Sequence, residues 1–283
     1  MAGRSAPTGR RIRIATELRK LRERAGLTAT EAARVHGIGQ GQLSNIETAR
    51  FGVSGERLRT MAQNYECSDR AFIEALVDMV NDRKRGWWSD YQELLPTSLL
   101  DLAELEHHAE RLRGAITAHI PGLLQSADHA REIFRQHVPE LPPSDIEHRV
   151  SFRMKRQAVL CGAGPASYQA LIHEAALRTE VGGPETARAQ LWHLLDMSEQ
   201  DHVTIQVIPF KAGAVPGSGQ SIYYAYGPVP ELDTVHLDQS HGLAFLDAET
   251  QLRNYRTLFS RIEGAALSPQ DTRDLIHHIS QQL

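Results

Sequence analysis

Amide and hydroxyl side chains gather within a stretch of six residues, at Gln40, Gln42, Ser44 and Asn45. Such groups both donate and accept hydrogen bonds, which is the chemistry that reads base edges in the major groove of DNA. They can act together only if one exposed helix carries them. The apolar residues Leu43 and Ile46 predict a helix from about residue 40 to residue 48, with Glu47 among its outward residues.

A second helix is predicted immediately before this one. Thr28, followed three residues later by Glu31, forms the capping-box pattern that starts a helix. Ala32 and Val35 supply its apolar face, and Gly37 can adopt the left-handed conformation that ends it. Two helices joined by a glycine turn are typical of a DNA-binding helix-turn-helix, although helical proteins that do not bind DNA also contain such pairs.

The flanking segments favour DNA binding. Helices predicted over residues 16–25, 55–64 and 68–82 complete a five-helix domain around the central pair. Residues 1–66 contain 12 Lys and Arg against 6 Asp and Glu, a net charge of +6, whereas the other 217 residues contain 19 against 29, a net charge of −10. A basic module on an acidic chain suits a polyanionic partner.

The segment LRKLRERAGLTATEAARVHGIGQGQLSNIETAR, followed by GERLRTMAQNYECS, resembles the XRE family of helix-turn-helix regulators, relatives of the phage repressors. The resemblance covers about residues 14–70, and its most specific parts are LRxxRxxxGLT, QLSxIE and the LxxMA helix. It implies a lambda-repressor-like fold that binds double-stranded DNA. Gln40 matches the family. Ala29 departs from it, because many XRE proteins carry there a glutamine that braces a phosphate or a base-reading partner.

The residues expected to contact DNA are Gln40, Gln42, Ser44, Asn45, Arg50, Thr28, Arg10, Arg11 and Arg13. The two glutamines should approach bases, the serine and the asparagine should share base and phosphate contacts, and the arginines should bind phosphates. One such module contacts only a half-site, so a homodimer is expected.

The N-terminus is predicted to be a flexible basic arm over residues 1–13. It could lie along phosphates or in a minor groove, or it could be a solubilising tail. It lacks the apolar core of a secretion signal, and no apolar run approaches the roughly 18–20 residues that span a membrane. Cys67 and Cys161 are far apart, which excludes a disulfide framework. We expect a cytoplasmic, nucleoid-associated protein without membrane contact.

A chain of 283 residues can bury a second core beside a small helical module. The predicted organisation is an XRE helix-turn-helix domain over 14–82, a linker over 83–95 and a C-terminal domain over 96–283. Trp87 and Trp88 in the linker could stack on nucleic acid, but such aromatics more often pack a linker onto a neighbouring domain.

The C-terminal part mixes helical and extended patterns. Its strongest strand signal is the run of alternating β-branched residues from Val203, which ends at Pro209. Further strands at 167–172, 221–226 and 234–237 predict a sheet of about four strands, and residues 107–117 are extended in character. Helices are predicted at 98–105, 127–136, 145–160 (capped by Ser144), 185–197, 247–262 and 268–280. The predicted class is an α+β multidomain protein, with an N-terminal all-α five-helix domain followed by a mixed α/β domain.

The C-terminal part also carries a resemblance. IPGLLQSADHAREIF, RQAVL, LIHEAALRTEVGGPETARAQLWHLL and VTIQVIPFKAGA occur in order as in the C-terminal domain of actinobacterial XRE regulators of the WhiJ type, over about residues 90–280. Many members are described as antitoxin-like and are paired with a small neighbouring protein of the BldB-like family. The resemblance implies a transcription regulator whose C-terminal domain mediates dimerisation and binds such a partner.

No catalytic, metal or cofactor site is predicted. His173 and Glu174 do not begin an HExxH zinc motif, because position 177 is Leu. Adjacent histidines, as at 107–108 and 277–278, point about 100° apart on a helix and rarely hold one metal together. The Gly-rich stretch 213–219 lacks the Lys-Ser/Thr ending of a phosphate loop. We therefore expect a protein that is not an enzyme.

A small-molecule pocket is the alternative for the C-terminal part. Four aromatic residues could line an apolar cavity with polar tips, or could equally form the core between sheet and helices: Trp192, Tyr223, Tyr224 and Tyr226. In the first case the protein would be a ligand-responsive transcription factor. The adjacent Gly/Pro loop, 211–219, is of the kind that often carries function.

Overall fold

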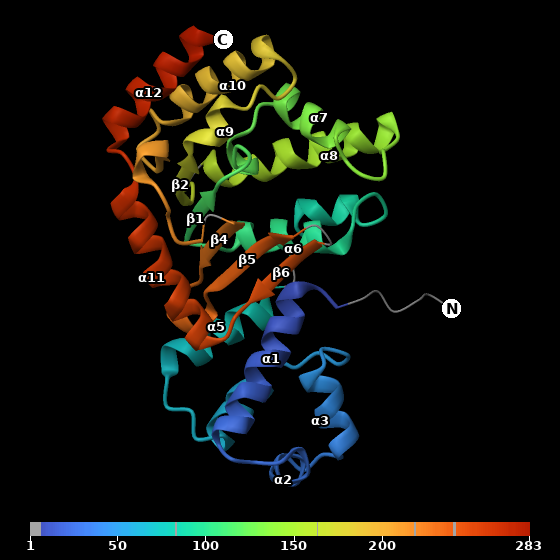
Figure 1. Cartoon of the computed structure of the whole chain (residues 1–283). Coiled ribbons are helices and arrows are strands. Elements are labelled where there is room, and N and C mark those ends of the chain that lie inside the picture. The colour runs from blue at the N-terminus through green and yellow to red at the C-terminus, as the bar shows by residue number, and fades with distance from the viewer. Residues whose placement is uncertain (1–6, 83, 163, 218, 240–241) are drawn as a thin grey trace. The chain divides into compact units, whose positions relative to one another are not determined.

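The structure is a computed structural model that describes residues 7–82, 84–162, 164–217, 219–239 and 242–283. The chain divides into two compact units (Figure 1). Residues up to Ser89, together with Leu100–Leu105, form the N-terminal unit, and Asp90–Leu99 together with Glu106–Leu283 form the C-terminal unit. The predicted class is confirmed: a helical N-terminal region is followed by a region that combines a sheet with helices.

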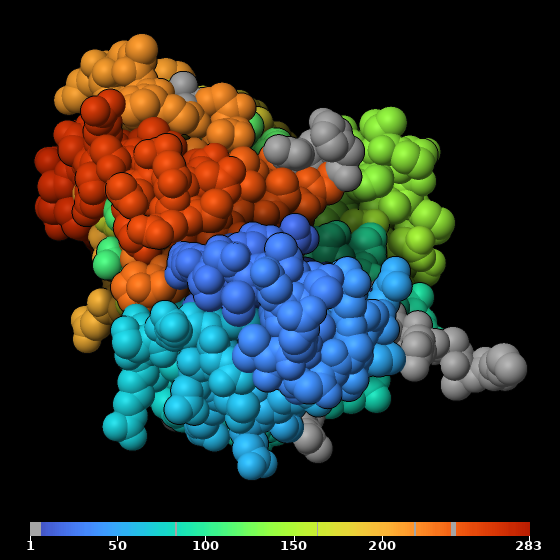
Figure 2. Space-filling model, turned by 90° about the horizontal axis from the view of Figure 1, so that it is seen from below, coloured from blue at the N-terminus to red at the C-terminus, as the bar shows by residue number. Residues whose placement is uncertain are grey.

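The N-terminal unit is built from short helices, which are α1 (Gly9–Arg24), α2 (Ala29–Val35), α3 (Gln40–Glu47), α4 (Gly55–Asn64) and α5 (Arg70–Asn81). Its core consists of leucines from four of them, fully buried at Leu18, Leu43, Leu58 and Leu76. The helices are too short to be stable alone, so this shared core is what holds them. Figure 2 shows the surface of this unit in blue to cyan.

The expected arm of residues 1–13 is wrong from residue 9 onward, because α1 begins at Gly9. Thr8 caps this helix by accepting a hydrogen bond from the Arg11 backbone N–H, and Asp101 Oδ1 accepts one from the Gly9 N–H at 2.7 Å. Orphan N–H groups at a helix start are stabilised by such acceptors, which explains the early start. Residues 1–6 of the arm lie outside the described residues.

The C-terminal unit contains a six-stranded sheet within the described residues, where about four strands were expected. Its strands are β1 (Arg111–Ile116), β2 (Ser167–His173), β3 (Val203–Ile208), β4 (Ser221–Tyr226), β5 (Thr234–Gln239) and β6 (Gly242–Leu246). The strand order is β3-β2-β1-β4-β5-β6. The β1–β2 and β2–β3 pairs are parallel and the others antiparallel, so β1 joins a parallel half to an antiparallel half. The pattern missed β6 because this edge strand is short and partly exposed.

The helices that follow α5 are α6 (Thr97–His107), α7 (Ala127–Arg135), α8 (Pro143–Arg156), α9 (Glu174–Arg178), α10 (Pro184–Met197), α11 (Glu249–Ala265) and α12 (Pro269–Gln282). Short 3-10 turns lie at Trp87–Tyr91, Gly122–Leu124, Gln157–Leu160, Phe210–Ala212 and Pro230–Leu232. Pro184 occupies the first turn of α10 as predicted. Ser144 does not cap α8, because that helix already begins at Pro143.

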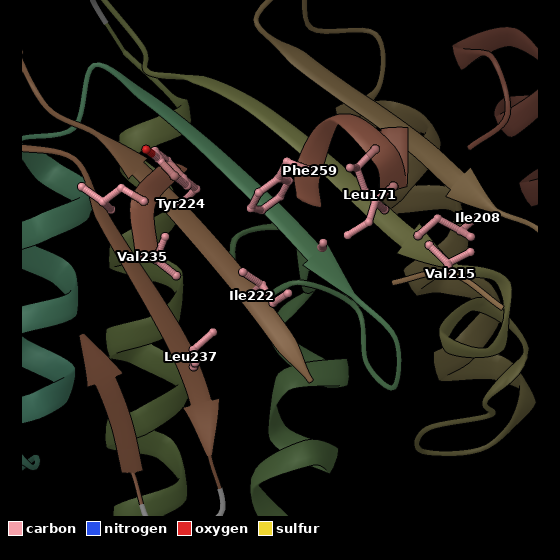
Figure 3. Close-up of a cluster of buried hydrophobic side chains, with 11 residues drawn as sticks. Leu171, Ile208, Val215, Ile222, Tyr224, Val235, Leu237 and Phe259 are labelled. Atoms are coloured by element: carbon pink, nitrogen blue, oxygen red, sulfur yellow. The ribbon is translucent and has the colours of Figure 1, made fainter. Parts of the chain in front are cut away.

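One face of the sheet packs against α11. Tyr224 and Ile222 of β4, Val235 of β5 and Leu171 of β2 are fully buried there against Phe259 of α11 (Figure 3). These side chains share a face because neighbouring residues of a strand point to opposite sides of a sheet.

The hydroxyl group of Tyr224 is hydrogen-bonded within this apolar layer. Its hydroxyl donates to Asp233 Oδ2 at 2.7 Å, and Arg256 Nε donates to the hydroxyl oxygen at the same distance. Arg256 also bonds Asp233 directly. A buried hydroxyl that is hydrogen-bonded in this way stabilises the core rather than weakening it.

The other face carries a histidine in its interior. His236 of β5 is buried, with its ring stacked on that of Tyr223 at 4.4 Å. Burial, and secondly the nearby Arg156, lower the pKa of His236 to about 3. The folded protein therefore holds this imidazole in its neutral form.

Four helices of the N-terminal unit are followed, within two residues of their ends, by a residue with positive φ. These residues are Gly26, Gly37, Ala49 and Glu66. At the end of α4, Glu66 (φ 57°) donates to the Gln63 carbonyl and Cys67 to the Ala62 carbonyl. Glycine adopts this conformation without the steric cost that a side chain incurs.

Glu66→Gly should therefore raise the free energy of unfolding by about 0.5–1 kcal/mol. Thermal or urea unfolding of the full-length protein measures this. The matched control is Gln63→Gly on the same helix at a right-handed position, which should lower stability by about 1 kcal/mol. Destabilisation by both variants would contradict the left-handed assignment.

The buried histidine generates a pH prediction. Because the pKa of His236 is lower in the folded chain than in the unfolded chain, the unfolded state takes up the proton first as the pH falls. Stability is therefore lost on going from pH 7 to pH 5, by about 2 kcal/mol from this residue.

The variant His236→Phe keeps an aromatic ring against Tyr223 and removes this titration. Urea unfolding at both pH values should show a smaller loss for the variant than for the wild type. Equal losses in the two proteins would show that the histidine does not titrate on unfolding.

Candidate nucleic-acid interface

The helix pair α2–α3 forms through the local signals that predicted it. Thr28 Oγ1 accepts from the Glu31 N–H at 3.2 Å, and Glu31 Oε2 accepts from the Thr28 N–H at 2.8 Å, so the capping box is confirmed. Gly37 adopts φ 62°, as expected for the residue that ends α2. The following Ile38 N–H donates to the Ala33 carbonyl at 2.9 Å, which closes the turn and directs the chain into α3.

Helix α3 has one buried side and one exposed side. Leu43 and Ile46 are buried in the unit, as predicted. Gln40, Gln42 and Ser44 are exposed, and Asn45 is partly exposed. The exposed amides and hydroxyl therefore occupy one short helix that the apolar side holds in place. Their contact with DNA stays a prediction.

Glu47 was expected on the outward side of α3, and this is wrong. Its carboxylate accepts from Arg22 Nε at 2.7 Å and from Arg22 Nη2 at 3.0 Å, and both side chains are less than one-tenth exposed. The third nitrogen of Arg22, Nη1, donates to the Leu27 carbonyl at 2.8 Å. The signal that could have revealed this is spacing, since Glu47 follows Leu43 by one helical turn. The hydrogen bonds of Glu47 raise the pKa of Arg22 further.

The arginines expected at phosphates have different environments. Arg11 is exposed, and its Nη2 lies 3.4 Å from the Ala49 carbonyl just beyond α3. Arg50 is exposed as well. Arg13 binds Glu17 Oε1 at 2.7 Å and is only about one-tenth exposed. Arg10 is also largely buried.

Arg10 lies beside two carboxylates, Asp82 at 3.9 Å and Glu104, and burial lowers its pKa. A largely buried guanidinium that already lies beside two carboxylates is poorly placed to bind a phosphate. The structure thus leaves Arg11 and Arg50 at the surface and turns Arg10 and Arg13 inward, contrary to the expectation of an exposed arm.

Thr28 and Ala29 stand where α2 begins. The Thr28 hydroxyl is engaged with Glu31 but remains exposed to solvent. Ala29 is the first residue of α2 and offers no polar group beyond its backbone. This end of α2 therefore presents a smaller polar surface than a glutamine at residue 29 would provide.

The four aromatic residues proposed to line one ligand cavity are not brought together. Tyr224 and Tyr226 lie on the α11 face of the sheet with ring centroids 4.5 Å apart. Tyr223 points to the opposite face, because it is their neighbour in β4. Trp192 is nearly half exposed on α10 and contacts His277 of α12.

Two further findings concern other kinds of site. Within the described residues, no group of three or more His, Cys, Asp or Glu is arranged to hold a metal ion. No helix in the described ranges is both long and apolar enough to cross a membrane.

The Arg22–Glu47 pair predicts how α3 is held. Removing one partner of a buried ion pair leaves an uncompensated charge, so Glu47→Ala should destabilise the N-terminal unit by about 3 kcal/mol. Hydrogen exchange of α3 backbone amides in the full-length protein measures the effect.

The matched control is Glu74→Ala. It removes a carboxylate bound to the Nε and Nη2 atoms of Arg59 in the same way, but at an exposed position. An exposed pair contributes little, so protection of α3 should not change. If the α3 amides are equally protected in the two variants, the buried Arg22–Glu47 pair does not hold α3 in place.

Two family models match the chain, one in each half of its organisation. A family model described as a helix-turn-helix domain matches residues 13–76, and a model described as a domain of unknown function (DUF5753) matches residues 99–278. No curated protein and no solved structure matches the chain. Residues 13–76 are thus a helix-turn-helix DNA-binding domain. Since the second match covers more than half of the sequence, the chain belongs to the DUF5753 family.

Proposed function

We propose that the protein is a sequence-specific transcription regulator that places α3 in the major groove of double-stranded DNA. The observation that carries the proposal is the exposed side of α3. Gln40, Gln42 and Ser44 are exposed to solvent there, while the other side of the helix is buried. Side-chain amides can bond adenine bidentately, and hydroxyls bond several bases. Asn45, partly exposed, adds a further amide at the edge of this surface.

Phosphate contacts complete the interface. Arg11 and Arg50 are exposed near the C-terminal end of α3, where they can bind the backbone on one side of the groove. Thr28 offers a hydroxyl at the start of α2. The inward Arg10 and Arg13 contribute by fixing α1 rather than by touching DNA.

The regulator is proposed to act as a homodimer, because one module of this size reads only a half-site. The C-terminal unit would mediate dimerisation and bind a small protein of the BldB-like kind, in an antitoxin-like arrangement. The support for this partner is the resemblance of residues 90–280 to regulators of the WhiJ type.

The test begins with a binding site selected from a random DNA pool by the full-length protein. The site should be a palindrome whose half-sites lie about 10 base pairs, or a multiple of that, apart. The double variant Gln40→Ala with Gln42→Ala should lose about thirtyfold or more in discrimination between this site and scrambled DNA, because each of the two lost base contacts contributes about 1–3 kcal/mol. Gel-shift titration measures both affinities.

Arg50→Ala is the companion variant. Since it removes a phosphate contact, it should weaken binding to both DNAs equally and reduce the salt dependence of the affinity by about one unit of slope. If the double glutamine variant selects the same sequence with unchanged affinity while its circular dichroism is normal, α3 is not the reading helix.

A further inference from the structure

The face of the C-terminal sheet opposite α11 carries polar side chains that DNA binding does not use. We define the α8-face cluster as Arg153 and Arg156 of α8, Tyr168 of β2 and Tyr223 of β4. Gly114 of β1 lies between the two tyrosines: a Cβ atom there would stand 3.1 Å from Tyr168 Oη and 3.4 Å from Tyr223 Cδ1. The Ile116 side chain is nearer still, at 2.8 Å, so the two phenol rings and this isoleucine together pack over Gly114.

Arg153 forms no ion pair or hydrogen bond with a described carboxylate, although Asp238 and Glu106 act on its charge from farther away. Its Nη1 donates to the amide oxygen of Gln125 at 2.5 Å, and its guanidinium lies over the Phe134 ring at 4.2 Å. Its Nε is buried and has no hydrogen-bond partner, and no described residue accepts a hydrogen bond from its Nη2. Burial, with the neighbouring Arg156, lowers the pKa of Arg153 to about 10. Arg153 is thus a partly exposed cation whose Nε is buried and whose hydrogen-bond partner is a neutral amide.

Other arginines of the chain show what the open edge of Arg153 can bind. Arg22 uses Nε and Nη2 to hold both oxygens of Glu47. Arg156, one helical turn from Arg153, uses the same two nitrogens to hold Glu106 at 2.8 and 2.6 Å. This edge of a guanidinium fits the two oxygens of a carboxylate or a phosphate. At Arg153 the corresponding edge has no such partner.

Gly122 lies beside this edge and contributes no side chain to cover it. A Cβ atom at Gly122 would stand 3.6 Å from Arg153 Nε, 3.9 Å from Arg153 Cζ and 3.9 Å from Arg156 Nη1. Both guanidinium groups therefore approach the same glycine. Arg156 is already neutralised by Glu106, so an anion beside Gly122 would act chiefly on Arg153.

Two more buried donors nearby lack partners. The Tyr168 hydroxyl is buried without a hydrogen bond, and its electrostatic neighbours include Tyr223 and Arg156. His129 of α7 is buried with both ring nitrogens unpartnered, and burial together with Arg153 lowers its pKa to about 4. An unpartnered buried donor costs about 1–3 kcal/mol, so the Arg153 Nε, the Tyr168 hydroxyl and the His129 ring, each beside one of the two arginines of this face, require an explanation.

We propose that the α8-face cluster binds a small organic anion, with a carboxylate or phosphate group on the Nε–Nη2 edge of Arg153 and the Tyr168 hydroxyl as a second donor. The ligand gives Arg153 the direct anionic contact that none of its described hydrogen-bond partners supplies. The site uses Tyr223 from the aromatic set first considered for a ligand, whereas Tyr224 and Tyr226 belong to the opposite face. The proposal does not depend on DNA binding by α3.

Calorimetric titration of the full-length protein tests the proposal, with citrate as the carboxylate probe and glycerol phosphate and inorganic phosphate as the phosphate probes. Sodium chloride at matched ionic strength is the control for non-specific screening. At least one probe should bind with a Kd below about 1 mM and raise the melting temperature, and the probe that binds identifies the anionic group. If no probe binds in this range, the proposal is overturned.

Variants locate the binding. Arg153→Lys keeps the positive charge but removes the two-nitrogen edge, so it should weaken the anion by about tenfold or more. Tyr168→Phe should weaken it about five- to tenfold without lowering the melting temperature of the free protein, because the hydroxyl it removes has no partner. A merely structural tyrosine would not show this combination.

Tyr224→Phe is the matched control on the α11 face. It removes a hydroxyl that is bound to Asp233 and Arg256, so it should lower the melting temperature and leave the affinity for the anion unchanged. Wild-type affinity in Arg153→Lys and in Tyr168→Phe would place any bound anion elsewhere and refute the site.

Discussion

Arg22 is a cation withdrawn from water, and the last residue of α3 supplies its counter-charge. The same guanidinium also bonds the Leu27 carbonyl, so one side chain of α1 binds both the chain that enters α2 and the end of α3. A buried charge that loses its partner costs several kcal/mol, so α3 cannot rotate about its axis without a large penalty. The direction in which Gln40, Gln42 and Ser44 point is therefore fixed by an interaction in which none of them takes part.

Local signals were sufficient for the parts of the fold that depend on neighbouring residues. The capping box of α2, the left-handed Gly37 and the first-turn Pro184 each need only a few residues to specify a conformation. Contacts between distant residues could not be inferred in this way. Glu47 was placed outward because a carboxylate on a short helix is normally solvated. Its spacing from Leu43 indicates the inward side, but the cation that makes a carboxylate stable there, Arg22, lies 25 residues earlier in the chain.

The C-terminal sheet shows the same division. The strand at 221–226 was predicted, and its alternation already separates Tyr223 from Tyr224. What the alternation cannot give is the position of β1, which pairs with β2 in parallel and with β4 antiparallel, through residues that are far apart in the chain. That pairing decides which side chains share each face. It places Tyr224 under α11, where its hydroxyl is hydrogen-bonded. It places Tyr223 near two arginines, a neighbourhood that neither residue composition nor strand alternation predicts.

On α3, the residues that hold the helix are not the residues that it exposes. Leu43, Ile46 and Glu47 fix its position, whereas Gln40, Gln42 and Ser44 contribute almost nothing to the core. Substitutions at such exposed positions usually change folding free energy by less than about 0.5 kcal/mol. Over evolutionary time the exposed side of this helix can therefore acquire a different pattern of hydrogen-bonding groups one residue at a time. Because each such substitution leaves the fold stable, proteins that share this fold can come to bind different DNA sequences without an unstable intermediate.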